Sequence, residues 1–312
     1  TSAPQSGYST RKMNAGLIRN RGVELSLGGM PVSTKNWKWE MNFNIAKNSN
    51  KLVELADGVD SYSIYWTSFT TRLYNYAMVG KSLGVITGNT WERDDNGNII
   101  FHELSASQKA LYGGEYVPTY NQNTLDELGN FHPDFTGGFN TSISFKNFRL
   151  SANIDFSVGG QIVSYTNMWG SSSGILDKTA ELNDRGVNVR EPISKGGGIH
   201  MTGVDQNGNK VDTYVNAKLY YTTASRVWEE WVYDRTYVKL REVSLSYVFP
   251  SQTLKKLNIG LSRASVAINA SNPWLIYSAC PNVDVSEIGM GYFEGGNAAA
   301  TRSIGFTVNL AF

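Results

Sequence analysis

The sequence predicts an all-β chain whose strands form part of the wall of a large transmembrane β-barrel with long extracellular loops. Apolar and polar residues alternate along segments of about ten to fourteen residues, longer than the roughly five or six usual in globular proteins and suited to a tilted strand that crosses a bilayer. The links between these segments alternate between short and long, as at the two ends of an outer-membrane barrel. No run of about 18 apolar residues occurs, so no transmembrane helix is expected.

The C-terminal segment 302–312, RSIGFTVNLAF, carries the clearest alternation. Every second residue is apolar, and the residues between are polar or small. A barrel strand places alternate side chains against lipid and toward the lumen. The residues expected to face lipid, with the last ring at the inner membrane interface, are Ile304, Phe306, Val308, Leu310 and Phe312.

Six further segments show the same two-residue period. The pair of segments on either side of Lys146 and Asn147 predicts a hairpin with a very short turn. The alternation changes phase at Val238 and Leu240, which predicts a bulge or the exit from the apolar zone. The seven expected strands lie near 16–30, 37–47, 136–146, 149–163, 236–249, 264–277 and 302–312.

The links alternate strictly in length. The short links are 31–36, 147–148 and 250–263, and the long links are 48–135, 164–235 and 278–301. Outer-membrane barrels have short periplasmic turns and long external loops. Counting back from the last strand therefore places the C-terminus in the periplasm and all three long links outside the cell.

The long links contain local signals of their own. Segments 103–112 and 176–185 predict short helices, with Ser105 and Asp177 as caps. The Asn-Gly pairs within 94–98 and 205–209 predict tight hairpin turns. Segments of such length are usually functional or mobile.

Composition excludes several classes of function. The 312 residues carry a net charge of +1, which gives no reason to expect a nucleic-acid partner, and the single Cys280 excludes an internal disulfide. The three histidines have no metal-ligand spacing, and no nucleophile or phosphate motif occurs in its required context. Segment 205–216 begins like a calcium loop but ends on Asn216 instead of a glutamate. We therefore expect no enzyme, no cofactor and no metal site.

One stretch of the first long link is dense in aromatic residues. Segment 61–76, SYSIYWTSFTTRLYNY, mixes Tyr, Trp and Phe with hydroxyl side chains and arginine. Aromatic faces stack on sugar rings, while the polar groups bond their substituents. The alternative is that these rings pack the loop onto the barrel rim or onto a partner lid. The candidate ligand-contacting residues are Trp66, Tyr74, Tyr76 and Trp91.

Several motifs resemble one transporter family. YDRTYVKLREVSLSYVFP, INASNPWLIY, PNVDVSEIG and ATRSIGFTVNLAF are similar, in this order, to the C-terminal end of the SusC/RagA family of TonB-dependent outer-membrane transporters. NRGVELSLGG, WKWEMNFNIAKNSNKLVEL and LGNFHPDFTGGFNTSISFKNFRLSANIDFSVGG resemble the same family upstream. Pro273 and the VDVSE stretch depart from its usual pattern, which leaves the shape of the last external loop open.

The resemblance implies a function and partners. It implies import of bulky nutrients across the outer membrane, mostly oligosaccharides and in some members oligopeptides, with energy from TonB delivered through an N-terminal plug. It also implies a SusD-like surface lipoprotein as a lid and outer-membrane lipid around the barrel. Seven strands cannot close a bacterial barrel, which uses an even number. Residues 1–312 are therefore expected to form the C-terminal portion of the barrel, about a third of a transporter, without its plug and N-terminal strands.

A second fold remains open from the alternation alone. A secreted β-sandwich, acting as an adhesin or a carbohydrate-binding module, also alternates apolar and polar residues. It would have strands of about six residues and no rhythm in the lengths of its links.

Overall fold

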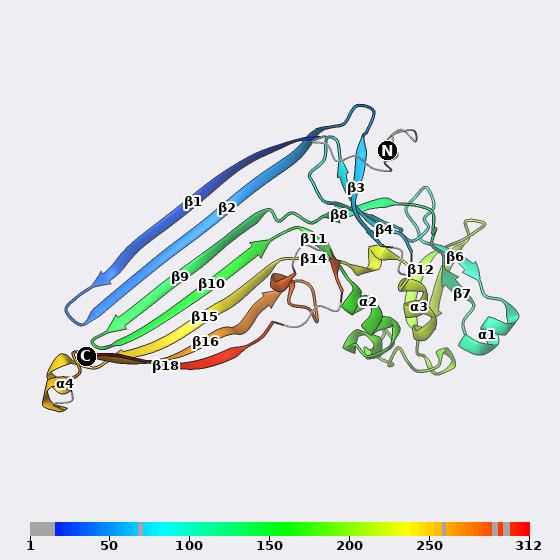
Figure 1. The fold of residues 1–312 in the computed structure, drawn as a ribbon. Coiled ribbons are helices and arrows are strands. Elements are labelled where there is room, and N and C mark those ends of the chain that lie inside the picture. The colour runs from blue at the N-terminus through cyan, green and yellow to red at the C-terminus, as the bar shows by residue number, and fades with distance from the viewer. Residues whose placement is uncertain (1–15, 68–70, 258–259, 289–292, 296–299) are drawn as a thin grey trace, which may run out of the picture.

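A computed structural model describes the chain except for residues 1–15, 68–70, 258–259, 289–292 and 296–299 (Figure 1). Its dominant element is a seven-stranded antiparallel sheet of long strands. In spatial order the strands are β1 (Gly16–Ser33), β2 (Trp37–Leu55), β9 (Phe135–Phe145), β10 (Phe148–Val158), β15 (Tyr237–Val248), β16 (Arg263–Ser278) and β18 (Ser303–Ala311).

Each of the seven expected segments forms one strand of this sheet, and the strands pair in chain order. Two boundaries differ from the prediction by more than three residues. β2 runs on to Leu55. The segment predicted at 149–163 divides at Gly159 and Gly160, whose φ angles of +77° turn the chain, so that β10 ends at Val158.

The register places apolar side chains on one face of the sheet across all seven strands. Residues paired across antiparallel strands point to the same side. One complete row of successive partners is Val32, Trp39, Ile143, Leu150, Leu245, Ile268 and Phe306. The side chain of Phe306 remains 67% exposed. Among the described residues no second sheet covers this face, so the β-sandwich alternative is wrong.

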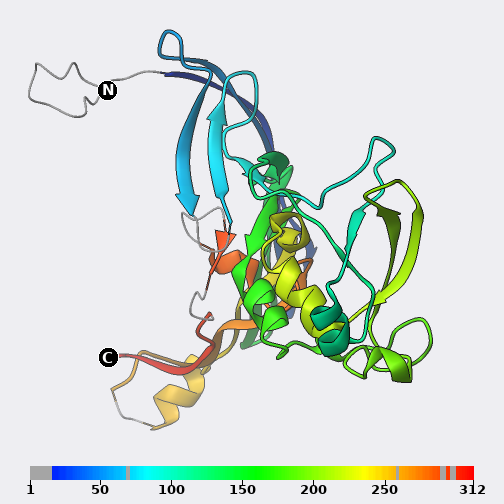
Figure 2. The same ribbon diagram turned by 90° about the vertical axis from the view of Figure 1, so that its right-hand side faces the viewer.

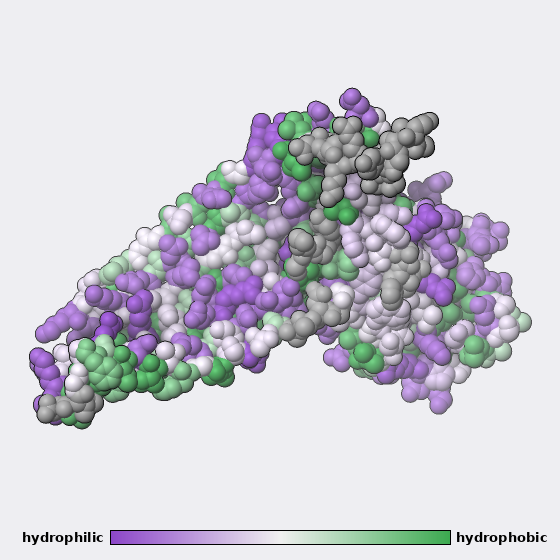
Figure 3. Space-filling model, in the orientation of Figure 1, coloured by the Kyte–Doolittle hydropathy of each residue, from purple (hydrophilic) through white to green (hydrophobic). Residues whose placement is uncertain are grey.

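The opposite face is polar. The neighbouring row of partners is Glu40, Ser142, Ser151, Ser244, Asn269 and Gly305. Hydroxyl and amide groups bond along this row: Ser244 Oγ donates to Asn269 Oδ1 at 2.6 Å, and Asn269 Nδ2 donates to Thr307 Oγ1 at 3.0 Å. Figure 3 shows hydrophilic residues over the face of the sheet turned toward the viewer.

Links of different length gather at different ends of the sheet. Links 34–36, 146–147 and 249–262 lie at one end together with the C-terminus, and the long links lie at the other (Figure 1). Lys146, with φ +50°, makes the two-residue turn between β9 and β10. The third short link contains helix α4 (Ser251–Leu257), which was not expected from the sequence. In the described part of the chain, every helix is too short or too polar to span a membrane.

Links 56–134 and 159–236, with part of the link after β16, pack into one unit that we call the long-link body (Figure 2). It holds a three-stranded sheet and two four-stranded sheets. The three-stranded sheet consists of β14 (Val232–Asp234), β11 (Gln161–Ser164) and β17 (Phe293–Glu294). One four-stranded sheet consists of β13 (Lys210–Val215), β12 (Ile199–Asp205), β6 (Ile100–Glu103) and β7 (Tyr116–Pro118). The other consists of β3 (Ser61–Thr67), β4 (Leu73–Met78), β5 (Val85–Gly88) and β8 (Asp126–Asn130). The helices of the body are α1 (Ala106–Tyr112), α2 (Tyr165–Ser172) and α3 (Ala217–Ala224).

The long-link body has a hydrophobic core of its own. Trp228, Trp231 and Met168 are fully buried at its centre, and residues from both links surround them. Strands from different links also pair: β6 runs parallel to β12, and β11 runs parallel to β17. The long links are therefore one folded unit, a property that local sequence signals did not predict.

The predicted local elements of the long links are confirmed with one exception. Ser105 caps α1 in a capping box with Gln108. Gly97 and Gly208 occupy left-handed positions in the two Asn-Gly turns. Segment 176–185 contains only a 3₁₀ turn, Asp177–Ala180, and the residue before it makes no side-chain cap. Asp177 is therefore the first residue of this turn and not its cap.

Candidate ligand-contacting surfaces

Three of the four candidate aromatic residues lie on one face of the β3–β4 hairpin. Trp66 pairs across the hairpin with Tyr74, so their side chains point to the same side. Tyr76 follows two positions after Tyr74, and the two rings stack with centroids 5.2 Å apart and planes 17° apart. Trp66 is 59% exposed. We call Trp66, Tyr74 and Tyr76 the aromatic platform.

The platform offers neutral groups to a ligand. Burial, together with the adjacent Tyr74 hydroxyl, raises the pKa of Tyr76, so its hydroxyl stays protonated at physiological pH. Flat rings with hydroxyl groups at their edges combine a stacking surface with hydrogen-bond donors and acceptors. This arrangement suits a ligand with both apolar and hydroxyl faces, such as a sugar ring.

Trp91 lies elsewhere, in the core of the long-link body. It is 2% exposed, its Nε1 donates to Glu230 Oε1 at 2.6 Å, and its ring packs 6.2 Å from that of Tyr220. The adjacent Glu229 accepts from the Trp91 backbone N at 3.1 Å and forms an ion pair with Arg93. Burial leaves the Trp91 ring without a face for a ligand. The expectation for Trp91 is thus corrected to a packing role, and the two glutamates are structural.

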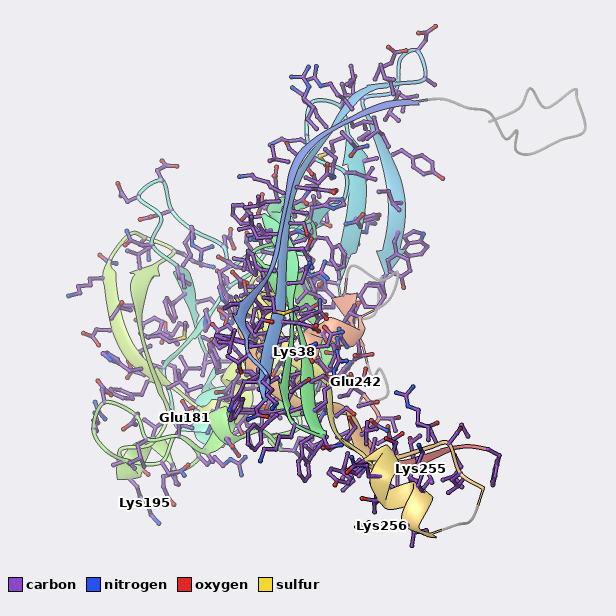
Figure 4. All side chains as sticks on the ribbon, turned by 90° about the vertical axis from the view of Figure 1, so that its left-hand side faces the viewer. Lys38, Glu181, Lys195, Glu242, Lys255 and Lys256 are labelled. Atoms are coloured by element: carbon purple, nitrogen blue, oxygen red, sulfur yellow. The ribbon has the colours of Figure 1, made fainter. Side chains whose placement is uncertain are left out.

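The polar face of the sheet contains a shallow cavity of 400 Å³. Arg149 crosses it, donating from Nε to Ser142 Oγ at 2.8 Å and lying 3.5 Å from a Glu40 carboxylate oxygen. The polar residues that line it come from four adjacent strands; they are Glu40, Asn42, Asn140, Thr141, Ser142, Arg149, Ser151, Asn153 and Glu242. Figure 4 shows Lys38 and Glu242 on the sheet, while Lys255 and Lys256 lie apart on α4.

A segment after β16 folds back onto this polar face. We call residues 279–288 the strap. Lys239 of β15 is 1% exposed, and its ammonium contacts the Asp284 and Glu287 carboxylates at 2.7 Å each and Ser286 Oγ at 3.0 Å. A buried ammonium is costly unless it is paired and hydrogen-bonded. The strap supplies these partners.

Arg241 joins the strap to the sheet at the predicted irregularity. In the pairing of β10 with β15, Asn153 faces Glu242 and Ile154 faces Leu240, which leaves Arg241 as an extra residue. This bulge confirms the prediction made from the phase change. The Arg241 guanidinium bonds both oxygens of Asp155 at 2.9 Å and also contacts Glu287.

The charges of the strap are coupled to the wall. The hydrogen bond from Lys239 lowers the pKa of Glu287 despite the opposing effect of burial. Burial acts against ionisation of Asp284 as well, but the bonds from Lys239 and Ser286 outweigh it and lower its pKa. These are the acidic residues of the VDVSE stretch that departs from the family pattern. The departure signalled an unusual loop, but not its contact with β15.

Apolar contacts hold the other side of the strap. Cys280 and Val285 are buried with Ile162 in a small hydrophobic cluster. Burial raises the pKa of the Cys280 thiol to about 12, so the thiol stays protonated at neutral pH.

The polar residues with metal-like patterns have other partners. Asp205 accepts from the backbone N of Asn207 at 2.8 Å and of Asn209 at 2.9 Å, as a tight turn requires. His200 lies between Asp184 and Asp212, at 2.9 and 2.8 Å. Within the described ranges, no three His, Cys, Asp or Glu side chains gather as a metal site.

Comparisons with known proteins agree with this architecture. No family model matches the chain. The chain is 27% identical to TonB-dependent receptor P3 of Formosa agariphila over 287 residues, which cover 89% of the chain and 26% of that receptor. It is 38% identical to TonB-dependent receptor SusC of Bacteroides thetaiotaomicron over 202 residues, which cover 61% of the chain and 19% of SusC. None of these relatives is named as an enzyme.

A solved structure shows the same fold. The RagAB peptide importer in its closed-closed state superposes with a TM-score of 0.67 over 100% of this chain and 31% of the importer chain, at 17% identity. The chain thus spans about a quarter of the length of the receptor P3 and a third of the solved importer chain. The chain is thus similar in sequence to TonB-dependent receptors, SusC among them, and its fold matches that of part of the RagAB importer chain.

Proposed function

We propose that this chain forms part of the wall and external loops of an outer-membrane transporter that imports bulky nutrients. The observation that carries the proposal is the seven-stranded sheet with one apolar and one polar face. The apolar face suits contact with lipid, because unsatisfied polar groups are costly in hydrocarbon. The polar face suits a water-filled transport path. The sequence similarity to TonB-dependent receptors supplies the class of transport.

The proposed orientation places the C-terminus and the short turns in the periplasm and the long-link body outside the cell. The separation of link lengths between the two ends of the sheet supports this orientation. Phe312 then lies at the inner interface, where aromatic rings are favoured. The expected lipid-facing set remains Ile304, Phe306, Val308, Leu310 and Phe312.

The proposed partners follow from the family. Energy would come from TonB through a plug region, and a SusD-like lipoprotein would close the external side. In the part of the chain that the structure describes, β1 and β18 each pair with a strand on one side only, which supports the view that further strands complete the wall.

The aromatic platform is the proposed contact for cargo, and an oligosaccharide is the first candidate. Trp66 presents an exposed ring on the same face as the stacked rings of Tyr74 and Tyr76, which add hydroxyl groups. An oligopeptide is the second candidate, because solved structures that share this fold include those of a peptide importer.

Uptake in whole cells tests the transport proposal. Cells that carry the receptor should accumulate labelled oligosaccharides or oligopeptides, and cells without it, or without TonB, should not. Equal uptake of every cargo in all three strains would contradict the proposal.

Binding to the purified receptor tests the platform. Trp66→Ala should weaken oligosaccharide binding by about tenfold, the scale of one lost aromatic contact. Tyr62→Ala provides the matched control, because Tyr62 is exposed on the opposite face of β3. Equal binding by the two variants would show that the platform does not contact the cargo.

A further inference from the structure

A second aromatic feature lies across the β3–β4 hairpin from the platform. Tyr65 follows Ser63 beyond a bulge and pairs with Asn75, so it points away from Trp66. It borders a cavity of 610 Å³ between β3, α2 and β17. Its apolar walls are Tyr65, Tyr165, Trp169, Ile175, Leu176 and Phe293. We call this cavity the aromatic slot.

The rings of the slot are built onto the core. Phe293 lies between Tyr65 and Tyr165, with ring centroids 4.8 and 5.2 Å away. Tyr165 in turn packs edge-on against the buried Trp228 at 5.1 Å. Three segments far apart in the sequence therefore supply one continuous aromatic wall.

A buried carboxylate holds this wall in place. Glu294 is 3% exposed and accepts from Ser164 Oγ at 2.8 Å and from the backbone N of Thr166 at 3.1 Å. These bonds attach β17 to the start of α2, beside the parallel pairing of Phe293 with Val163. Phe293 is thus positioned by a buried polar contact, which is the mark of a preformed pocket.

The other wall depends on a glycine. A Cβ at Gly170 of α2 would lie 2.7 Å from Leu176 Cγ, too close for contact. Gly170 therefore allows the turn after α2 to fold back and bring Leu176 against the helix. The slot is shaped at both sides by close packing.

The chemistry of the walls selects the ligand group. The polar groups among the lining are the Trp169 indole N–H and the hydroxyls of Thr67, Thr166, Ser173 and the two tyrosines, and Thr166 Oγ1 already bonds Glu294. A sugar ring carries hydroxyl groups around its edge, and burying them with so few partners is unfavourable. A hydrocarbon side chain needs no hydrogen-bond partner.

We infer that the aromatic slot binds an aromatic or branched aliphatic side chain of an oligopeptide cargo. A peptide combines such side chains with a polar main chain, which matches an apolar cavity that has a few hydroxyl groups in its lining. The inference rests on the proposed import function and makes it specific: the slot holds the apolar side chain, and the aromatic platform lies on the other face of the same hairpin.

The test uses the purified receptor in detergent and three probes: a hexapeptide with one central phenylalanine, the same peptide with serine there, and maltoheptaose. Calorimetry should give tighter binding of the phenylalanine peptide than of the serine peptide by about tenfold to a hundredfold, the scale for burying one such side chain.

Two variants locate the binding. Trp169→Ala removes one wall, and Gly295→Leu fills the slot without removing an aromatic residue. Both should reduce binding of the phenylalanine peptide to the level of the serine peptide. Trp66→Ala is the matched control on the opposite face of the hairpin and should leave this preference unchanged.

The outcomes separate the slot from the wider proposal. If maltoheptaose binds and the two peptides do not differ, the slot inference is wrong while the import proposal stands. A phenylalanine preference that survives both slot variants also overturns the inference. If cells with and without the receptor take up all three probes equally, the import proposal itself fails.

Discussion

The seven-stranded sheet and the long-link body differ in where their apolar side chains lie. In the sheet, the side chains of Leu245, Ile268 and Phe306 point outward and stay exposed. In the body, Trp228 and Trp231 are enclosed by residues from two links. The hydrophobic effect explains both arrangements if the two regions have different surroundings. The body buries its apolar side chains in its own interior, whereas the outward-facing side chains of the sheet require contact with lipid.

This contrast also separates two kinds of sequence information. A strand with one apolar and one polar face repeats one local pattern, so each strand can be recognised from its own residues. The body is held by contacts between residues more than a hundred positions apart, such as Trp91 with Glu230. Five predictions test the contrast, from the largest expected effect to the smallest.

Removing a core ring should damage the body and not the sheet. Trp228→Ala is expected to cost about 3–5 kcal/mol, since it leaves a large cavity in packed surroundings. Urea-induced unfolding, followed by the fluorescence of the remaining tryptophans, measures this loss. Phe306→Ala is the control: in lipid it should cost much less, because the ring has no protein core to leave. Equal losses of stability in the two variants would contradict the proposed difference between the body and the sheet.

A charge on the outer face should damage the sheet. Val308→Arg is expected to cost about 2–4 kcal/mol if the residue faces the middle of the bilayer. Assembly into phospholipid vesicles, read from the heat-dependent mobility of the folded barrel, measures the effect. Thr307→Arg, one residue away on the polar face, should assemble normally. If both variants assemble alike, the assignment of the faces is wrong.

The strap should depend on Lys239. Lys239→Met leaves the carboxylates of Asp284 and Glu287 without their ammonium and is expected to cost about 1–3 kcal/mol in local stability. Amide hydrogen exchange across 279–288 reports it. Lys255→Met, on the exposed end of α4, is the matched control and should change nothing in the strap.

The same contact predicts a pH dependence. The pKa values of Asp284 and Glu287 are lowered from 3.8 and 4.5, so the strap gains stability above those values and loses it as the pH falls through the lowered ones. Exchange in the strap should therefore accelerate in acid. An unchanged pH dependence in Lys239→Met would show that other groups set it.

The smallest effect concerns a local cap. Ser105→Ala removes the capping box of α1 and should cost about 1 kcal/mol. Faster amide exchange confined to 106–112 is the expected result. Ser107→Ala, within the helix, is the comparison variant. A loss that spread through the body would mean that α1 supports more than itself.

The sequence by itself determined the strands, their order, the two faces and the sorting of links, because a strand in this wall is specified by a two-residue period that each segment carries alone. It also determined Ser105 as a cap and the bulge near Val238 and Leu240, since both are local.

Only the tertiary structure decided which aromatic residues meet. Trp66, Tyr74 and Tyr76 share a face because of hairpin register, whereas Trp91, equally aromatic and equally within a long link, is buried by partners from 220–231. The strap and the aromatic slot follow the same rule. Their residues come from segments separated by long stretches of chain, and no local period records which of these segments will pack together.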